Sequence, residues 1–277
     1  MRRIAIALLA AAGPLAAASA ADAADTQTAA SGTVAATLAY TLDEGGLSAT
    51  DVRITVTRAG VLAYDAPVDP RPCENGTCSP ISTDADSPAV AVTDLDGDGE
   101  PEVVVDVYTG GAHCCTVSRM LRWDGARYVP LDRNWGDVGY SRDDVDADGR
   151  PELVSADDRF AYLYGSYAAS VFPVQVLALR GGRLVDVTRS FPALVRADRV
   201  RTYRLARRSH GFGRTAYAAW AADRYLLGER AAALRTLRRL ARRGRLRTDI
   251  GDNSRRGQVR WVSRLDRDLR RFGYQRR

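Results

Sequence analysis

The nine residues DLDGDGEPE at positions 94–102 recur almost unchanged as DVDADGRPE at positions 144–152. In both stretches acidic residues occupy loop positions 1, 3, 5 and 9, and a glycine occupies position 6. This spacing lets a short loop wrap a hard cation such as Ca²⁺, which takes six to eight oxygen ligands at roughly 2.3–2.6 Å, while the glycine makes the sharp turn. The two stretches therefore predict two loops that each bind calcium.

The expected ligands are the acidic side chains together with the backbone carbonyl at loop position 7. They are Asp94, Asp96, Asp98, Glu100 and Glu102 in the first loop, and Asp144, Asp146, Asp148, Arg150 and Glu152 in the second. We expect about two bound ions in a structural role. Ca²⁺ is favoured over Mg²⁺, because Mg²⁺ resists dehydration and requires a tighter octahedron. The alternative is a pair of solvated turns without metal, and the positive charge of Arg150 makes the second loop the weaker candidate.

The segments around each loop have the composition of β-strands. A short apolar run leads into each loop, a β-branched run leaves it, and a hairpin with a D-G or G-G turn follows. The strands expected in the first unit are 88–93, 102–108, 117–123 and 128–131, and those in the second are 138–142, 152–155, 174–179 and 184–187. Further strands are expected at 33–41, 52–58 and 61–64.

This order of strand, D-x-D-x-D-G-x-P-E loop, strand and hairpin resembles the FG-GAP and VCBS repeats, which form the blades of integrin-type β-propellers in many secreted bacterial proteins. The resemblance covers residues 88–189, a little over a third of the chain. It implies calcium at the four acids at positions 1, 3, 5 and 9 of each loop. A propeller needs at least four blades to close, and only two clear units are present, so we expect an open stack or a sandwich.

From Phe191 onward the hydrophobic period changes from two residues to about 3.6, which predicts helices. Within 230–243 one face is apolar and the opposite face carries Arg235, Arg238, Arg239 and Arg242. The predicted fold class is therefore a mainly β N-terminal domain of blade-like antiparallel units, followed by an all-α C-terminal domain. We place the β-repeat domain at 32–191 and the basic helical domain at 192–277.

The first residues have the pattern of an export signal. Arg2 and Arg3 precede an apolar run, and A-S-A at 18–20 is a cleavage motif, with a second cleavage site after Ala23. We therefore expect a signal peptide at 1–20, a disordered linker at 21–31 and a secreted or extracytoplasmic bacterial protein. No later segment is long and apolar enough to predict a transmembrane helix in the mature chain.

Four cysteines, Cys73, Cys78, Cys114 and Cys115, follow this signal. An even number in an oxidising compartment favours disulfides. We favour two bonds that join Cys114 and Cys115 each to one of Cys73 and Cys78. The alternative is a local bond between Cys73 and Cys78. A zinc or copper site built on His113 and the thiols is less consistent with export.

The two halves of the chain differ sharply in charge. From Phe191 onward 25 arginines accompany 7 acids, a net charge of +18, whereas the preceding residues carry −12. All 40 basic residues are arginine, which indicates codon bias and weakens any inference to phosphate binding. No nucleic-acid motif is present. We favour an ordinary solvated surface for the basic tail, and the alternative is a surface that binds an anionic envelope polymer or a glycan.

The second unit is interrupted at 157–171 by an insertion rich in aromatic residues. Phe160, Tyr162 and Tyr164 would share one face of a strand, and Tyr167 and Trp135 complete a set that could bind sugar rings or peptides. We favour the other interpretation, in which these residues form core.

Motifs of known enzyme classes are absent from the sequence: it has no G-x-S-x-G, no H-E-x-x-H and no phosphate-binding loop. We therefore predict a non-catalytic binding or scaffolding protein. The alternative is a secreted carbohydrate-active hydrolase with structural calcium, for which Asp106, Asp157 and Asp158 are candidate acids.

Overall fold

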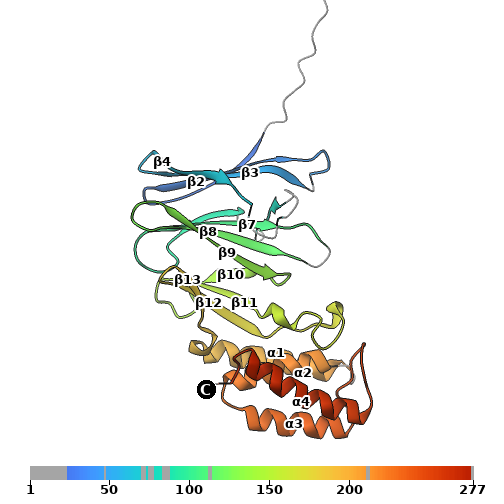
Figure 1. Ribbon diagram of the computed structural model, residues 1–277. Coiled ribbons are helices and arrows are strands. Elements are labelled where there is room, and N and C mark those ends of the chain that lie inside the picture. Colours follow the sequence, from blue (N-terminus) through green and yellow to red (C-terminus); the bar gives the residue numbers. More distant parts are fainter. Residues whose placement is uncertain are drawn as a thin grey trace, which may run out of the picture.

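The computed structural model describes residues 24–46, 48–69, 73, 78–82, 88–111, 114–209 and 213–275. Three antiparallel β-sheets follow one another along the chain and stack in line, and four helices pack beyond the last sheet (Figure 1). Within the described residues the sheets do not close into a ring. The predicted fold class is thus confirmed. The expected signal peptide lies outside the described residues.

The first sheet is a four-stranded meander. Its strands are β1 (Asp25–Ser31), β2 (Val34–Leu42), β3 (Ala49–Arg58) and β4 (Val61–Pro67). The prediction of a disordered linker over 21–31 was wrong for residues 25–31, because β1 pairs with β2 along its whole length, from Asp25 opposite Tyr40 to Ser31 opposite Val34. The side chain of Gln27 secures this edge: its amide donates to the Tyr40 hydroxyl (3.0 Å) and its carbonyl accepts from the backbone N–H of Ala89 (2.6 Å).

The second and third sheets contain the two acidic loops. The second sheet comprises β5 (Ser79–Pro80), β6 (Val90–Thr93), β7 (Glu102–Tyr108), β8 (Thr116–Trp123) and β9 (Tyr128–Gly136). The third comprises β10 (Tyr140–Asp143), β11 (Glu152–Ala156), β12 (Val174–Arg180) and β13 (Arg183–Asp186). The expected strand order is therefore present in both units, with boundaries that differ by a few residues.

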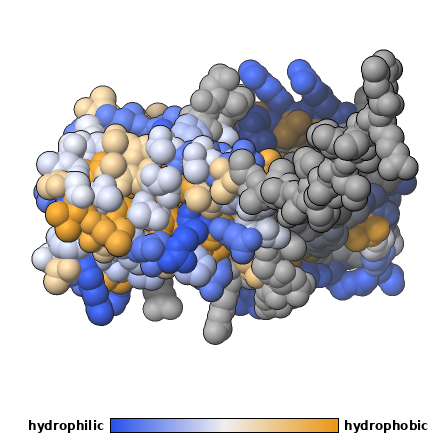
Figure 2. Space-filling model, turned by 90° about the horizontal axis from the view of Figure 1, so that it is seen from above, coloured by the Kyte–Doolittle hydropathy of each residue, from blue (hydrophilic) through white to orange (hydrophobic). Residues whose placement is uncertain are grey.

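Strand β7 shows why the sheets stack. Because successive side chains point to opposite faces of a strand, Val103, Val105 and Val107 pack in the core shared with the first sheet, whereas Val104 packs in the core shared with the third. Both faces of the central sheet are thus buried. On the outer face of the first sheet, hydrophilic and hydrophobic side chains are mixed where grey residues do not cover it (Figure 2). This face ends the stack.

The C-terminal region is a helical layer. It contains α1 (Pro192–Arg208), α2 (Arg214–Leu226), α3 (Arg230–Arg242) and α4 (Arg255–Arg271). Phe191 and Val187 are buried with Val176 and Ala178 of β12, so that α1 is attached to the third sheet through an apolar contact. Among the described residues, no helix combines the length and the apolar character needed to cross a bilayer.

Candidate metal centres

Each acidic loop connects two paired antiparallel strands, β6 and β7 in the second sheet and β10 and β11 in the third. The first loop leaves β6 and returns in β7 with Thr93 opposite Glu102, and the second leaves β10 and returns in β11 with Asp143 opposite Glu152. The glutamate at loop position 9 is therefore the first residue of the returning strand in both sheets. This register places its side chain beneath the loop that precedes it.

The aspartate at loop position 1 organises the backbone of each loop. In the first loop the two carboxylate oxygens of Asp94 accept from the backbone N–H groups of Gly97 (2.7 Å) and Gly99 (2.9 Å). In the second, Asp144 accepts from Asp148 and Gly149, both at 3.0 Å. The loops are thus curled by their own carboxylates, as is common for Asp in tight turns.

Positive backbone φ angles are needed at two places in each loop. Gly97 and Gly99 have φ angles of +76° and +88°, and Gly149 has +87°. The residue equivalent to Gly97 in the second loop is Ala147, which adopts φ +59°. This conformation costs an alanine more than a glycine, so the second loop is the less relaxed of the two.

The glutamate at position 9 ties each loop to its strand. Glu102 accepts from the backbone N–H of Leu95 through Oε2 (2.9 Å), and Glu152 accepts from Val145 in the same way (3.1 Å). The Glu102 side chain is only 1% exposed. Its other oxygen, Oε1, and Oδ1 of Asp96 are both buried without a hydrogen-bond partner. Buried polar atoms are rarely left unpartnered, and here both belong to predicted calcium ligands.

The electrostatics of the first loop favour a cation. Burial raises the pKa of Glu102 to about 7, and the neighbouring charges of Asp96, Asp98 and Asp94 add to the effect. The pKa of Asp96 is also raised, first by burial and then by the charge of Asp98. A divalent ion would offset this repulsion and supply the partner that the two orphaned oxygens lack. The residues of the first loop therefore fit Ca²⁺.

The two loops do not present the same ligand set. Asp94, Asp96 and Glu102 each place one oxygen within 4.8 Å of the others, as do Asp144, Asp146 and Asp148 in the second loop. The first group is partly or fully buried, whereas the second is fully exposed and does not include Glu152.

Ion pairs with arginines engage some of the other predicted ligands. The side chain of Glu100 pairs with Arg58 of β3 (2.5 Å), and that of Asp148 pairs with Arg150. Neither arginine partner was predicted, because the sequence pattern records only the spacing of the acids. Asp98 accepts from the backbone N–H of Glu100 (2.8 Å).

The disulfide pairing differs from the favoured prediction. Cys73 bonds to Cys78, with their Cα atoms 5.5 Å apart, and Cys114 bonds to Cys115. The cross-linked arrangement was therefore wrong, and the local Cys73–Cys78 alternative is confirmed. The chain brings the two pairs to one core, where Cys78 and Cys115 are both buried, but each cysteine has a nearer partner within its own loop. The suggested metal site at His113 falls outside the described residues.

Most residues of the aromatic set form core. Trp135 and Phe160 are 1% and 2% exposed, so the favoured interpretation as core is confirmed for both, and the possible ligand-binding role is wrong for them. The insertion is not a strand but contains two short 3-10 turns, η1 (Asp158–Phe160) and η2 (Tyr167–Ala169). Tyr162 is 57% exposed and contacts the ring of Tyr167, with their centroids 5.2 Å apart, whereas Tyr164 packs against α4.

A buried polar network joins the second sheet to the third. Both carboxylate oxygens of Asp106 accept from the Tyr140 hydroxyl (3.0 and 3.1 Å), and Ser118 also donates to this carboxylate. The indole of Trp135 donates to Ser118 (2.7 Å), and Arg142 forms an ion pair with Asp106 (3.4 Å). Trp135 is therefore buried as part of the contact between the second and third sheets, and not as part of a ligand surface.

Part of the chain is similar in sequence to two known proteins. No protein-family model matches it. A probable thylakoid lumen protein of Synechocystis sp. is 39% identical over 101 residues, which cover 35% of this chain and 30% of the relative. An uncharacterized protein of Sinorhizobium fredii is 37% identical over 89 residues, 32% of this chain and 14% of the relative. The chain thus matches less than a third of the length of either relative.

Among solved structures, a protein related to a Xanthomonas type IV secretion system matches 58% of this chain and 92% of its own length, at 14% identity and a TM-score of 0.19.

Proposed function

We propose that this protein is an extracytoplasmic, calcium-stabilised binding or scaffolding module whose second and third sheets are repeats of the FG-GAP/VCBS type. The observation that carries the proposal is the pair of buried, unpartnered oxygens on Asp96 and Glu102. They face a loop whose acidic spacing suits Ca²⁺. The two disulfides and the similarity to a probable thylakoid lumen protein of Synechocystis support a location outside the cytoplasm.

Bound calcium would stabilise the folded state of this protein. The loops join β6 to β7 and β10 to β11, so an ion bound there would hold each strand pair in register. Extracellular calcium modules bind at about 10⁻⁴–10⁻³ M, so millimolar calcium would stabilise the folded state by roughly 0.4–1.4 kcal/mol per site.

Calorimetric titration of the chelated protein tests this proposal. We expect about two binding events with unequal affinity, and a melting temperature that rises with calcium concentration. Asp96→Asn should remove the tighter event, and Asp146→Asn should remove the weaker one. Asp124→Asn is a matched control, because Asp124 also caps a tight turn, accepting from the N–H groups of Ala126 (3.0 Å) and Arg127 (2.9 Å), but lies outside both loops. A protein that neither binds calcium nor gains stability from it would refute the proposal.

The hydrolase alternative receives less support from the acids that might serve it. Asp157 is 2% exposed and accepts from Arg159 (2.6 Å) and from the Tyr274 hydroxyl (2.7 Å) through one oxygen, Oδ2. Asp106 is similarly engaged in the network between the sheets. A glycan that binds and is turned over would favour the enzyme, and one that binds without turnover would favour the module.

The partner we propose for the helical region is an anionic envelope polymer. Arg235, Arg238, Arg239 and Arg242 are all exposed on α3. Among the described residues none of these four forms an ion pair. Reversing all four to Glu in the full chain should abolish binding to polyglutamate or another soluble polyanion. Wild-type binding should weaken steeply between about 50 and 200 mM salt.

A further inference from the structure

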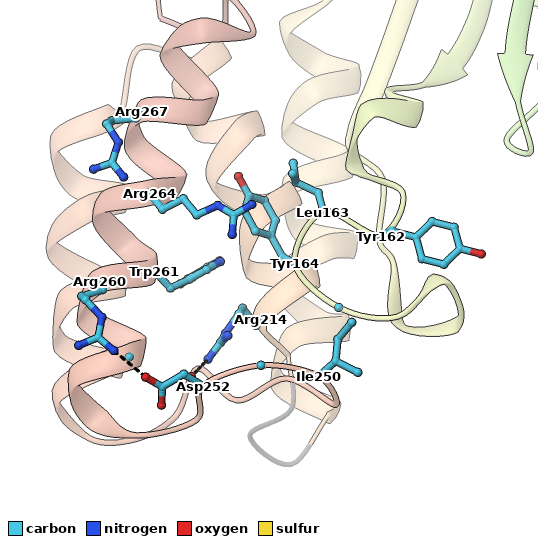
Figure 3. Close-up of a pocket in the computed structure, with 13 residues that line it drawn as sticks. Tyr162, Leu163, Tyr164, Arg214, Ile250, Asp252, Arg260, Trp261, Arg264 and Arg267 are labelled. Atoms are coloured by element: carbon cyan, nitrogen blue, oxygen red, sulfur yellow. Dashed lines mark hydrogen bonds and ion pairs between the residues drawn. The ribbon is translucent and has the colours of Figure 1, made fainter.

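A pocket of about 500 Å³ opens on the helical region, on a different element from the exposed arginines of α3 (Figure 3). Its walls come from three segments distant in sequence: the insertion at 162–165, the start of α2, and the segment from Ile250 through α4. Arg260, Arg264 and Arg267 are separated by four and three residues, and Trp261 is three residues before Arg264, which places them on one side of α4. The insertion that interrupts the second repeat thus forms one wall of a cavity against this helix.

The pocket is strongly cationic. Four arginines line it, Arg214, Arg260, Arg264 and Arg267, against the single acid Asp252. Both oxygens of Asp252 are engaged: Oδ2 pairs with Arg260 (2.7 Å), and Oδ1 accepts from the backbone N–H of Ser254 (2.8 Å). Arg264 pairs with Asp268 (3.5 Å). Arg214 and Arg267 remain without a carboxylate partner among the described residues.

Arg214 is the decisive residue because it is buried and makes no direct ion pair among the described residues, so that burial outweighs the favourable charge of nearby Asp252. It is 5% exposed, and its hydrogen bonds go only to neutral acceptors, the carbonyls of Leu246 (3.0 Å) and Asp252 (2.9 Å) and the amide of Asn253 (3.4 Å). Burial lowers the pKa of its guanidinium. A buried charge without a charged partner is costly. Among the described residues Nη1 has no acceptor, and it lies 3.7 Å from the position that a Cβ atom on Gly251, a residue of the pocket wall, would take.

The aromatic residues shape the rest of the pocket. The Arg214 guanidinium lies 5.5 Å from the centre of the Trp261 ring, and the rings of Tyr164 and Trp261 meet edge to face at 5.6 Å. In Figure 3 the guanidinium of Arg214 points between Trp261 and Asp252, whereas the ring of Tyr162 points away. The indole Nε1 is buried without a hydrogen-bond acceptor.

We propose that this pocket binds the oxyanion head of a small organic anion, with Arg214 as its principal contact and Arg267 as a second cation at the rim. A phosphoryl and a carboxylate group present the same chemistry to a guanidinium, whose planar fork binds both through paired hydrogen bonds. The ligand would supply the negative charge that Arg214 lacks. The proposal is independent of calcium binding.

The experiment follows the indole N–H resonances of full-length, calcium-loaded protein in ¹⁵N correlation spectra. The probes are inorganic phosphate, glycerol 3-phosphate and succinate, with glycerol and equal concentrations of chloride as references. The Trp261 indole, assigned from its loss in Trp261→Phe, should shift in a saturable manner. The indoles of Trp123, Trp135 and Trp220 should not move. If the two phosphates bind more tightly than succinate, the ligand carries a phosphoryl group. If succinate binds more tightly, the ligand carries a carboxylate.

Two variants locate the binding. Arg214→Gln should weaken binding at least about tenfold, because it removes the buried charge. Since Arg214 also holds two backbone carbonyls, this variant is compared with Arg267→Gln, an exposed residue whose loss should weaken binding about threefold without lowering the melting temperature. Arg235→Gln on α3 is the matched control and should bind normally. The proposal would be overturned if chloride shifted the Trp261 indole resonance as the probes do. It would also be overturned if all three arginine variants bound the probes with equal affinity.

Discussion

The side chain of Arg150, in the second acidic loop, lies directly over Gly97 of the first loop and leaves no room there for a Cβ atom. The two loops, fifty residues apart in the sequence, are therefore neighbours in space. The same arginine pairs with Asp148. It neutralises one carboxylate of the second loop, so a cation bound there would have to compete with it.

Replacing this arginine should strengthen the second calcium site. Arg150→Glu introduces the residue type that the first loop carries at the same position, and it frees Asp148. Because it removes a positive charge near the ion and adds a negative one, we expect calcium affinity at the second site to rise about tenfold at low salt. Titration calorimetry measures the change, and Arg127→Glu in the turn after β8 is the control. An unchanged weaker event would show that Arg150 does not compete.

Substitution of Glu102 should change stability in opposite directions with and without calcium. In chelator, Glu102→Gln should stabilise the fold by about 1 kcal/mol, because a neutral amide replaces a buried carboxylate with one unpartnered oxygen. The Leu95 N–H keeps an acceptor. In millimolar calcium the variant should be the less stable protein. Thermal melts under both conditions test this, with Glu152→Gln as the comparison. Equal shifts under the two conditions would argue against Glu102 as a ligand.

A buried aspartate in the helices predicts a pH dependence of stability. Asp223 of α2 is 0% exposed; burial raises its pKa well above the usual value, and the charge of Asp198 adds to this. The folded chain therefore binds a proton that the unfolded chain releases near pH 4. The contribution of Asp223 to stability is fully present below that pH and is lost as the pH rises toward the folded pKa.

Asp223→Asn removes the charge but keeps an oxygen that can accept from the Thr202 hydroxyl, which lies 3.1 Å from the carboxylate. The variant should gain about 1–2 kcal/mol of stability at pH 8 relative to the wild type, and less at pH 5. Chemical denaturation at both pH values measures the difference. Parallel curves for the two proteins would contradict the expectation.

The disulfide connectivity is a direct chemical prediction. Protein exported to an oxidising compartment should show no reactive thiol after denaturation, because all four cysteines are paired. Non-reducing peptide mapping should recover the Cys73–Cys78 bond and the Cys114–Cys115 bond, each within a single peptide. A fragment that joins the two regions would contradict this pairing.

Several features of the fold could be predicted because local patterns suffice for them. The β-branched run at 102–108 matches β7 (Glu102–Tyr108) in full, and the apolar stripe of Ala233, Leu234, Leu237 and Ala241 is the buried face of α3. Strand β1 was missed because its seven residues are small and polar, and only the partner strand β2 makes them a strand.

The sequence by itself determined the two acidic loops, the strand–loop–strand order around them and the change from strands to helices, because each depends on residues within a few positions of one another. The tertiary structure alone decided which side chains share a site. It buried Glu102 and left one of its oxygens unpartnered, placed Arg150 over Gly97, and made Trp135 part of a sheet interface, which excludes the possible ligand contact. It also brought Arg214 to face α4. Burial and charge pairing depend on contacts between segments far apart in the chain, and spacing along the sequence does not encode them.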